Sequence, residues 1–188
     1  MKVVILGGPG AGKSTQADRL SQHLQVPCLS TGDLLRSSLQ SVGESRAAGI
    51  TWADRAKVYV ERGELVPDEL MIAFIRDRLS QPPYASGWVL EGYPRTAFQA
   101  EELDFLLDSL NHHLDWAIWL DVPETTLRSR CQGRSRPDDE PTILERRLHN
   151  LEEYTSPLLD YYGHQKRLLR INGEGDPNAI TQMIMAQV

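Results

Sequence analysis

A glycine-rich turn between an apolar run and a helical pattern constrains this chain more than any other feature. Residues 2–15, KVVILGGPGAGKST, contain the pattern G-x-x-x-x-G-K-[S/T] between a β-branched strand sequence and a helical sequence. Glycines let successive backbone N–H groups point toward one anion, and the amino end of the helix adds positive charge. Lys13 can reach the outer phosphates, and Ser14 or Thr15 can contact Mg²⁺. A turn that only joins strand to helix is the alternative, but the strand, the spacing and the lysine together favour a bound nucleoside triphosphate.

Strand-like and helix-like segments alternate along the rest of the chain. The expected strands are 2–6, 27–30, 87–91, 114–122 and 167–172. The expected helices are 13–24, a helical stretch over 33–79 broken at Gly43, Gly63 and Pro67, 96–110, 124–131, 142–162 with a bend near Pro157, and 178–187. This alternation predicts an α/β fold of the P-loop NTPase type, in which a five-stranded parallel sheet carries helices on both faces.

Ligands of such sheets bind beyond the carboxyl ends of the strands. The residues expected there are Gly7, Ser30, Glu91 and Asp121. Two segments fall outside the alternation, a helical insertion over 31–67 and a polar loop over 132–141. We expect both to act as lids on a single domain that spans residues 1–188.

Composition limits the classes of partner. The net charge of −6 disfavours nucleic acid and acidic lipid, so an anionic ligand requires a local cluster of cations. No stretch approaches the roughly 20 apolar residues of a membrane span, and the first residues lack the features of a signal peptide. We therefore expect a cytoplasmic protein in which Cys28 and Cys131 are free thiols. The sequence has no obvious exposed apolar stripe, so a monomer is the default expectation.

The stretch WVLEGYPRTAFQ, residues 88–99, places unusual chemistry at a strand end. Glu91 can hold metal-bound water at the end of a strand next to the one that feeds the glycine turn. Gly92 allows close approach of a ligand to the backbone, and Arg95 projects a guanidinium fork suited to a second anionic group.

Gln99 has two possible roles. With Thr96 it forms the sequence pattern of a helix capping box, and capping alone is one interpretation. Gln99 also shares a helical face with three leucines, so its amide points inward and needs hydrogen-bond partners. A purine edge is one such partner.

Arginines are concentrated between positions 128 and 147. Pairing with the acids Asp138, Asp139 and Glu140 on a solvated surface accounts for some of them, and we assign Arg128 to that surface. Arg147 flanks the apolar stripe of its predicted helix while Arg146 points away, which favours Arg147 for a functional role. The remaining arginines, at or near the polar loop, are Arg130, Arg134 and Arg136.

Taken in order, these motifs resemble the adenylate kinase family of nucleoside monophosphate kinases over nearly the whole chain. The resembling segments are GGPGAGKSTQ (7–16), LSTGDLLR (29–36), GELVPDEL (63–70), LEGYPRTAFQ (90–99), GRSRPDD (133–139) and ERRL (145–148). The resemblance implies the reaction ATP + AMP ⇌ 2 ADP in nucleotide homeostasis, with Mg²⁺ as cofactor. It also implies that 31–67 is the subdomain that binds the monophosphate and that 132–141 is a short ATP lid.

The resemblance assigns roles residue by residue. It implies ATP contacts from Gly8, Pro9, Gly10, Ala11, Gly12, Lys13, Ser14, Thr15, Arg130, Arg134 and Gly173. It implies AMP contacts from Thr31, Arg36, Val60, Val66, Gly92, Arg95, Gln99, Arg136 and Arg147. The implied catalytic residues are Lys13, Arg95, Arg136 and Arg147, with Glu91 on the metal through water.

Two positions depart from the family pattern, which usually has aspartate at Glu91 and glycine at Ser14. A kinase for UMP, CMP or another acceptor is the first alternative, although Thr31 resembles the AMP-specific members. A P-loop switch without an acceptor site is the second alternative, and it leaves Arg95 and Gln99 without a common purpose.

Overall fold

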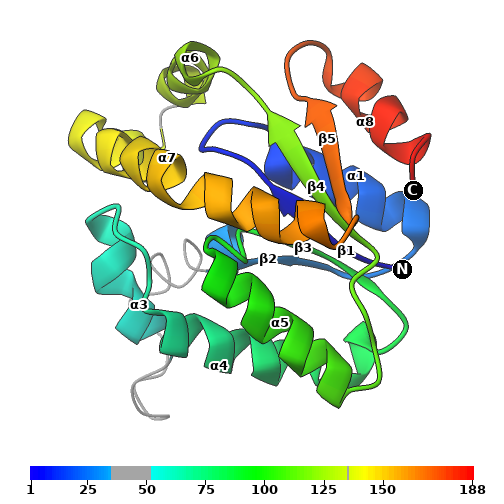
Figure 1. Cartoon of the computed structure of the whole chain (residues 1–188). Coiled ribbons are helices and arrows are strands. Elements are labelled where there is room, and N and C mark those ends of the chain that lie inside the picture. Colours follow the sequence, from blue (N-terminus) through cyan, green and yellow to red (C-terminus); the bar gives the residue numbers. More distant parts are fainter. Residues whose placement is uncertain (35–51, 135) are drawn as a thin grey trace.

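The computed structural model describes residues 1–34, 52–134 and 136–188. A five-stranded sheet forms its centre, with the spatial order β2-β3-β1-β4-β5 and every neighbouring pair parallel (Figure 1). The strands are β1 (Lys2–Leu6), β2 (Cys28–Ser30), β3 (Trp88–Glu91), β4 (Trp116–Asp121) and β5 (Leu168–Asn172). The predicted fold class is confirmed, and β3 does lie beside β1, the strand that feeds the glycine turn.

Helices connect the strands close to the predicted positions. They are α1 (Lys13–Leu24), α3 (Trp52–Glu61), α4 (Asp68–Leu79), α5 (Ala97–Ser109), α6 (Glu124–Arg134), α7 (Pro141–His164) and α8 (Pro177–Met185), with 3₁₀ turns at Pro82–Tyr84 and Pro137–Asp139. The predicted break between Gly63 and Pro67 is present, because α3 ends at Glu61 and α4 begins after Pro67. The predicted break at Gly43 lies outside the described residues.

The expectation of a loop over the whole of 132–141 is wrong. Helix α6 continues to Arg134, and α7 begins at Pro141 with Glu140 as its N-cap. The Glu140 carboxylate accepts hydrogen bonds from the backbone N–H groups of Thr142 and Ile143, which satisfies donors that a helix start leaves unpaired. This polar segment therefore includes the end of α6, the 3₁₀ turn at Pro137–Asp139 and the capped start of α7.

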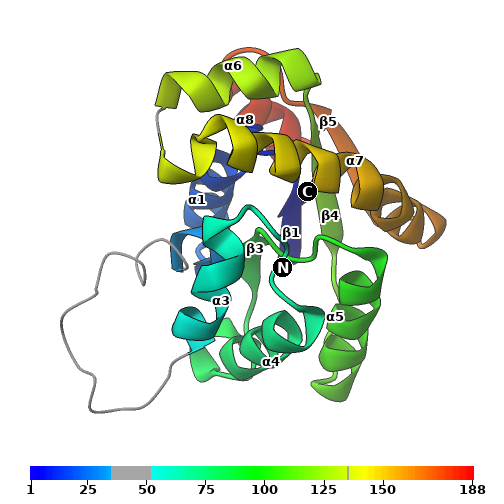
Figure 2. The ribbon, with the colours of Figure 1, turned by 90° about the vertical axis from the view of Figure 1, so that its left-hand side faces the viewer.

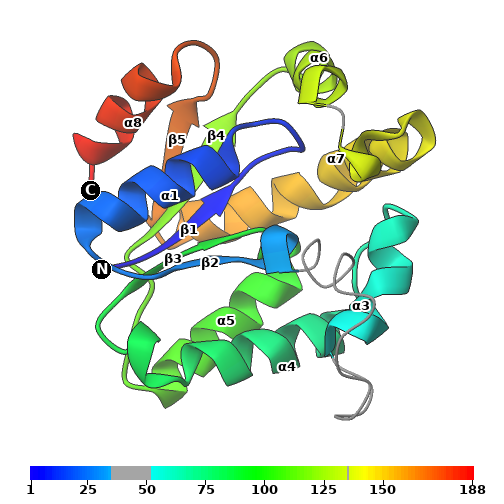
Figure 3. The same ribbon diagram turned by 180° about the vertical axis from the view of Figure 1, so that it is seen from behind.

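Two apolar cores hold the layers together. On one face of the sheet, side chains such as Val4 and Leu90 pack against α4, α5 and the second half of α7. On the other face, side chains such as Ile5 and Ile118 pack against α1, α8, α6 and the first half of α7 (Figure 3). Because β1 is buried on both faces, its sequence is continuously apolar rather than alternating.

Helix α7 contributes to both cores and also contacts the loop after α3. Arg146 donates from Nη1 to the backbone oxygen of Arg62 at 2.6 Å. Asn150 donates from Nδ2 to the backbone oxygen of Gly63 at 3.2 Å. Two backbone carbonyls of that loop are therefore fixed by α7.

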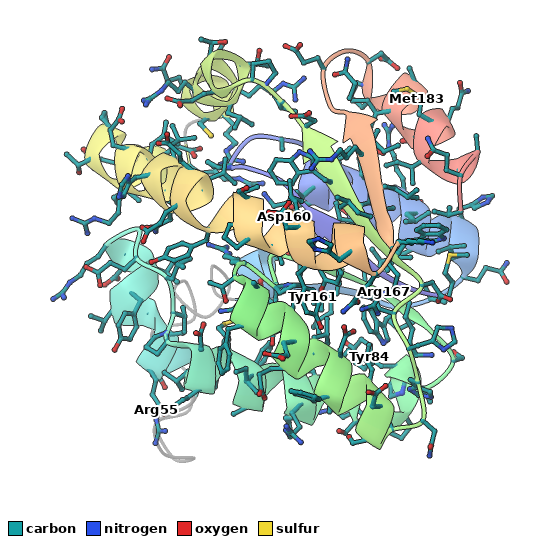
Figure 4. The ribbon with its side chains drawn as sticks, in the orientation of Figure 1. Arg55, Tyr84, Asp160, Tyr161, Arg167 and Met183 are labelled. Atoms are coloured by element: carbon teal, nitrogen blue, oxygen red, sulfur yellow. The ribbon has the colours of Figure 1, made fainter. Side chains whose placement is uncertain are left out.

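A polar cluster fixes the far end of α7. Tyr161 donates to Oδ2 of Asp104 on α5 at 2.7 Å, and Arg167 donates from Nη1 to Oδ1 of the same carboxylate at 3.0 Å. Figure 4 shows Tyr161 and Arg167 near one another where α7 leads into β5. The cluster ties α5, α7 and β5 together well away from the glycine turn.

No helix among the described residues combines the length and apolar character needed to cross a membrane.

Candidate active site

The glycine turn joins β1 to α1 at the carboxyl edge of the sheet. Gly10 and Gly12 have φ angles of 80° and 96°, which side chains other than glycine rarely adopt, and Gly12 is the N-cap of α1. The backbone N–H of Ala11 donates to the oxygen of Gly8 at 3.2 Å and closes the turn. The first N–H groups of α1 therefore open toward the same space as the turn.

Glycine is also required where the turn packs against α6. A Cβ atom at Gly10 would lie 2.9 Å from the backbone oxygen of Leu127, and one at Gly8 would lie 2.5 Å from the Cδ1 atom of Leu127. Cys131, a free and buried thiol, lies on the same side of the turn. The glycines thus serve both the backbone conformation and the close approach of a helix.

Lys13 lies at the first position of α1 and folds back over the turn. Its Nζ donates to the oxygen of Gly8 at 2.7 Å. Burial lowers the pKa of Lys13 to about 7; Glu91 opposes that shift, while Arg95 and Arg147 add to it. A phosphate oxygen in this position would stabilise the charged form of the lysine.

A cationic pocket surrounds Lys13. It has a cavity volume of about 240 Å³. Its lining comes from the glycine turn, the end of β3, α6 and α7, which meet beside the carboxyl edge of the sheet (Figure 2). The lining residues that the sequence singled out are Pro9, Gly10, Gly12, Lys13, Ser14, Thr15, Glu91, Gly92, Arg95, Arg130, Arg134, Arg136 and Arg147.

A second pocket lies on the side of α3 and α4 and has a cavity volume of about 60 Å³. Its lining includes Thr31, Val60, Val66, Met71, Gly92, Arg95, Gln99 and Arg147. Gly92, Arg95 and Arg147 line both pockets. The structure therefore offers two adjoining spaces that share two guanidinium groups. Arg36 lies outside the described residues.

Glu91 is the last residue of β3 and is 3% exposed, so its carboxylate is buried. Its Oε1 accepts hydrogen bonds from Ser14 at 3.2 Å and from Ser30. The side chain of Thr31 donates to the backbone oxygen of Glu91 at 3.2 Å. The two positions that depart from the family pattern, 14 and 91, are therefore in direct contact, which the sequence alone did not reveal.

Gln99 is 2% exposed, as its place on the leucine face predicted. Thr96 accepts a hydrogen bond from the backbone N–H of Gln99 at 3.1 Å, so half of the capping box forms. The Gln99 amide makes other contacts instead: Oε1 accepts from the backbone N–H of Arg95 at 2.8 Å, and Nε2 donates to Oδ1 of Asp68 at 2.7 Å. Sequence analysis missed Asp68, whose only local signal is an acid directly after Pro67 at a helix start.

Aspartates hold two of the pocket arginines. Arg134 makes a bidentate pair with Asp139 at 2.7 Å to each oxygen. Arg147 donates from Nη1 to Oδ2 of Asp138 at 2.8 Å. The predicted acid–arginine pairing is thus confirmed for these two, but on the pocket side rather than on a solvated face.

The other arginines separate into pocket and surface groups. Arg130 donates to the backbone oxygen of Gly173 at 3.0 Å, which brings Gly173 to the edge of the cationic pocket. Arg128 pairs with Glu124 and Glu145 on the outside of α6, as expected. Arg146 is half exposed and faces away from both pockets, as its helical position predicted.

The fold and the glycine turn define a P-loop nucleotide-binding protein. The second pocket, which adjoins the first, gives this P-loop protein space for a second ligand.

Comparison with known proteins gives the family. A family model described as "Adenylate kinase" matches residues 5–167. Adenylate kinase 2 of Nostoc sp. (strain PCC 7120) is 51% identical over 185 residues, which cover 98% of this chain and 97% of the relative. Adenylate kinase 2 of Synechocystis sp. (strain PCC 6803) is 47% identical over 188 residues, all of both chains. Adenylate kinase of Leptospira biflexa is 39% identical over 191 residues, which cover 100% of this chain and 99% of the relative. The chain belongs to the adenylate kinase family and is a kinase.

The packing of the glycine turn predicts opposite effects for two glycines. Gly10→Ala should lower the free energy of unfolding by about 2 kcal/mol, because it strains a positive φ angle and forces a Cβ atom against Leu127. Gly133→Ala, in α6 with open space around its Cβ position, should change it by less than about 1 kcal/mol and in the stabilising direction. Urea unfolding followed by circular dichroism measures both; equal losses would mean that the packing at Gly10 is not limiting.

Proposed function

We propose that this chain transfers the γ-phosphoryl group of ATP reversibly to AMP, with ATP in the cationic pocket and AMP in the second pocket. The observation that carries the proposal is that the two pockets adjoin at Gly92, Arg95 and Arg147. Two guanidinium groups at this junction would lie beside the group being transferred, where charge has to be stabilised.

The residue assignments follow the two pockets. The glycine turn and Lys13 would hold the β- and γ-phosphates, and Arg130 would lie against the nucleoside of ATP. Thr31 and Gln99 would contact AMP within the second pocket, together with backbone at Val60 and Val66. Arg36 keeps its implied AMP role as an expectation.

The chemistry requires positioning more than acid–base catalysis. The attacking oxygen of AMP is already anionic at neutral pH, so no general base is needed. Lys13, Arg95, Arg136 and Arg147 would stabilise the equatorial oxygens of the transferred group. Loss of one such donor would cost on the order of 3 kcal/mol, about a hundredfold in rate.

The residues present fit a Mg²⁺ ion that arrives with the nucleotide. No group of three or more potential metal ligands exists among the described residues, so phosphate oxygens and water would have to complete the coordination. The buried carboxylate of Glu91 would hold metal-bound water, while Ser14, which donates to Glu91 and keeps its lone pairs, or Thr15 would contact the ion. When bound, Mg²⁺ neutralises charge on the phosphates.

The location, oligomeric state and metabolic role of the protein are also proposals. The free thiols of Cys28 and Cys131 are consistent with a cytoplasmic protein. We propose that the protein is a monomer and that it maintains the balance of adenine nucleotides.

The direct test is to incubate the protein with ATP, Mg²⁺ and AMP and to measure ADP by chromatography. We expect two ADP molecules for each AMP consumed, and little ADP without AMP. Parallel reactions with UMP and CMP distinguish the acceptor. Faster turnover of a pyrimidine monophosphate, or ADP formation that does not depend on AMP, would overturn the proposal.

Arg95→Lys should lower kcat/KM for AMP by about a hundredfold and leave ATP binding nearly unchanged, because a point charge replaces a fork at the acceptor phosphate. Steady-state kinetics and ATP-analogue binding by calorimetry separate the two effects. Arg128→Lys is the matched control, since that arginine pairs with Glu124 and Glu145 on the outside of α6. An equal loss for both nucleotides would contradict the assignment.

Lys13 should couple nucleotide binding to proton uptake. With a pKa of about 7 in the free protein, about 90% of Lys13 is uncharged at pH 8. Phosphate oxygens favour the charged form, so binding raises the pKa and affinity should fall as pH rises above 7. Calorimetry with an ATP analogue at pH 8, in buffers of different ionisation heat, should detect uptake of up to about 0.9 proton. Lys13→Arg, which stays charged, should abolish that uptake; a variant with unchanged uptake would exclude Lys13 as its source.

A further inference from the structure

The side-chain amide of Gln99 is held at both ends by groups of opposite hydrogen-bonding character. Its Oε1 accepts from the backbone N–H of Arg95 at 2.8 Å, and its Nε2 donates to Oδ1 of Asp68 at 2.7 Å. The residue is 2% exposed, so water cannot readily replace a lost partner.

This pair of contacts fixes which way the amide points. A backbone N–H can only donate, and a carboxylate oxygen can only accept. Turning the Gln99 amide by 180° would set its NH₂ against the N–H of Arg95 and its oxygen against the carboxylate of Asp68. Both contacts would then be repulsive, so one orientation is strongly preferred.

The fixed amide still has unused capacity. Its oxygen has a second lone pair, and its nitrogen has a second hydrogen. Gln99 lines the second pocket beside Val66 and Met71. A base in that pocket would therefore meet one acceptor and one donor in a set order.

Purines differ in which order they need. Adenine carries an amino donor at position 6 next to ring nitrogens that accept, whereas guanine and hypoxanthine carry an acceptor oxygen at position 6. A freely turning glutamine amide could satisfy either pattern, but a fixed one can satisfy only one.

We propose that Asp68 is a positioning residue that sets acceptor specificity for 6-aminopurine over 6-oxopurine monophosphates by holding the Gln99 amide in one orientation. The inference rests on the proposed function, because it assumes that the acceptor base binds in the second pocket. Asp68 is itself well placed for this role: it is the first residue of α4, where the N–H groups of Leu70 and Met71 bond to the oxygen of Pro67.

The test compares AMP with IMP, which differ at position 6, as competing acceptors for wild type and Asp68→Asn. Asparagine keeps the shape of the side chain but can donate or accept, so it tolerates either amide orientation. We expect the ratio of kcat/KM for AMP to that for IMP to fall by about tenfold, the size of one net hydrogen bond, because the N–H of Arg95 still favours the original orientation.

Glu69→Gln is the matched control, since it removes the same charge from the next residue of α4 at an exposed position. Its AMP/IMP ratio should equal that of wild type, and thermal unfolding should show that both variants are folded. Equal losses for AMP and IMP in Asp68→Asn, or an unchanged ratio, would overturn the inference while AMP turnover by wild type upholds the proposed function. Wild-type protein that does not phosphorylate AMP would overturn both.

Discussion

Positive charge is concentrated in a small space beside the carboxyl edge of the sheet, and the fold has to hold it there. Lys13 and Arg147 face the same pocket. Burial is the largest cause of the low pKa of Lys13, about 7. The neighbouring arginines add to this lowering, whereas Glu91 opposes it. Carboxylates offset the repulsion, because Asp138 and Asp139 hold two arginines by ion pairs. The folded chain thus supplies anionic oxygens of its own to the cations that phosphate binding requires.

The parts of this arrangement that depend on local sequence could be predicted. Helix α1 has the predicted bounds, because a glycine turn before it and an amphipathic pattern within it mark both ends. The parallel sheet followed from the alternation of short apolar runs with helical ones. Even the choice of Arg147 over Arg146 for the pocket side followed from helical periodicity, and the structure places Arg147 there.

Contacts between distant segments could not be predicted in the same way. The Gln99–Asp68 contact joins two helix starts, and the Ser14–Glu91 contact joins the first turn of α1 to the end of β3. Neither depends on a repeating pattern, so periodicity gives no sign of them. The prediction of a loop over 132–141 was wrong for a related reason. The acids of this segment cap a helix or form ion pairs, and composition does not distinguish such acids from solvent-exposed ones.

Helix α7 has a mechanical consequence beyond its place in the two cores. It carries Arg147 into the cationic pocket, and through Arg146 and Asn150 it grips the carbonyl groups of the loop that follows α3. A helix that contacts the walls of both pockets transmits a displacement of one wall to the other. While these two hydrogen bonds are intact, a movement of α7 also moves the loop after α3, so the cationic pocket and the second pocket are mechanically coupled.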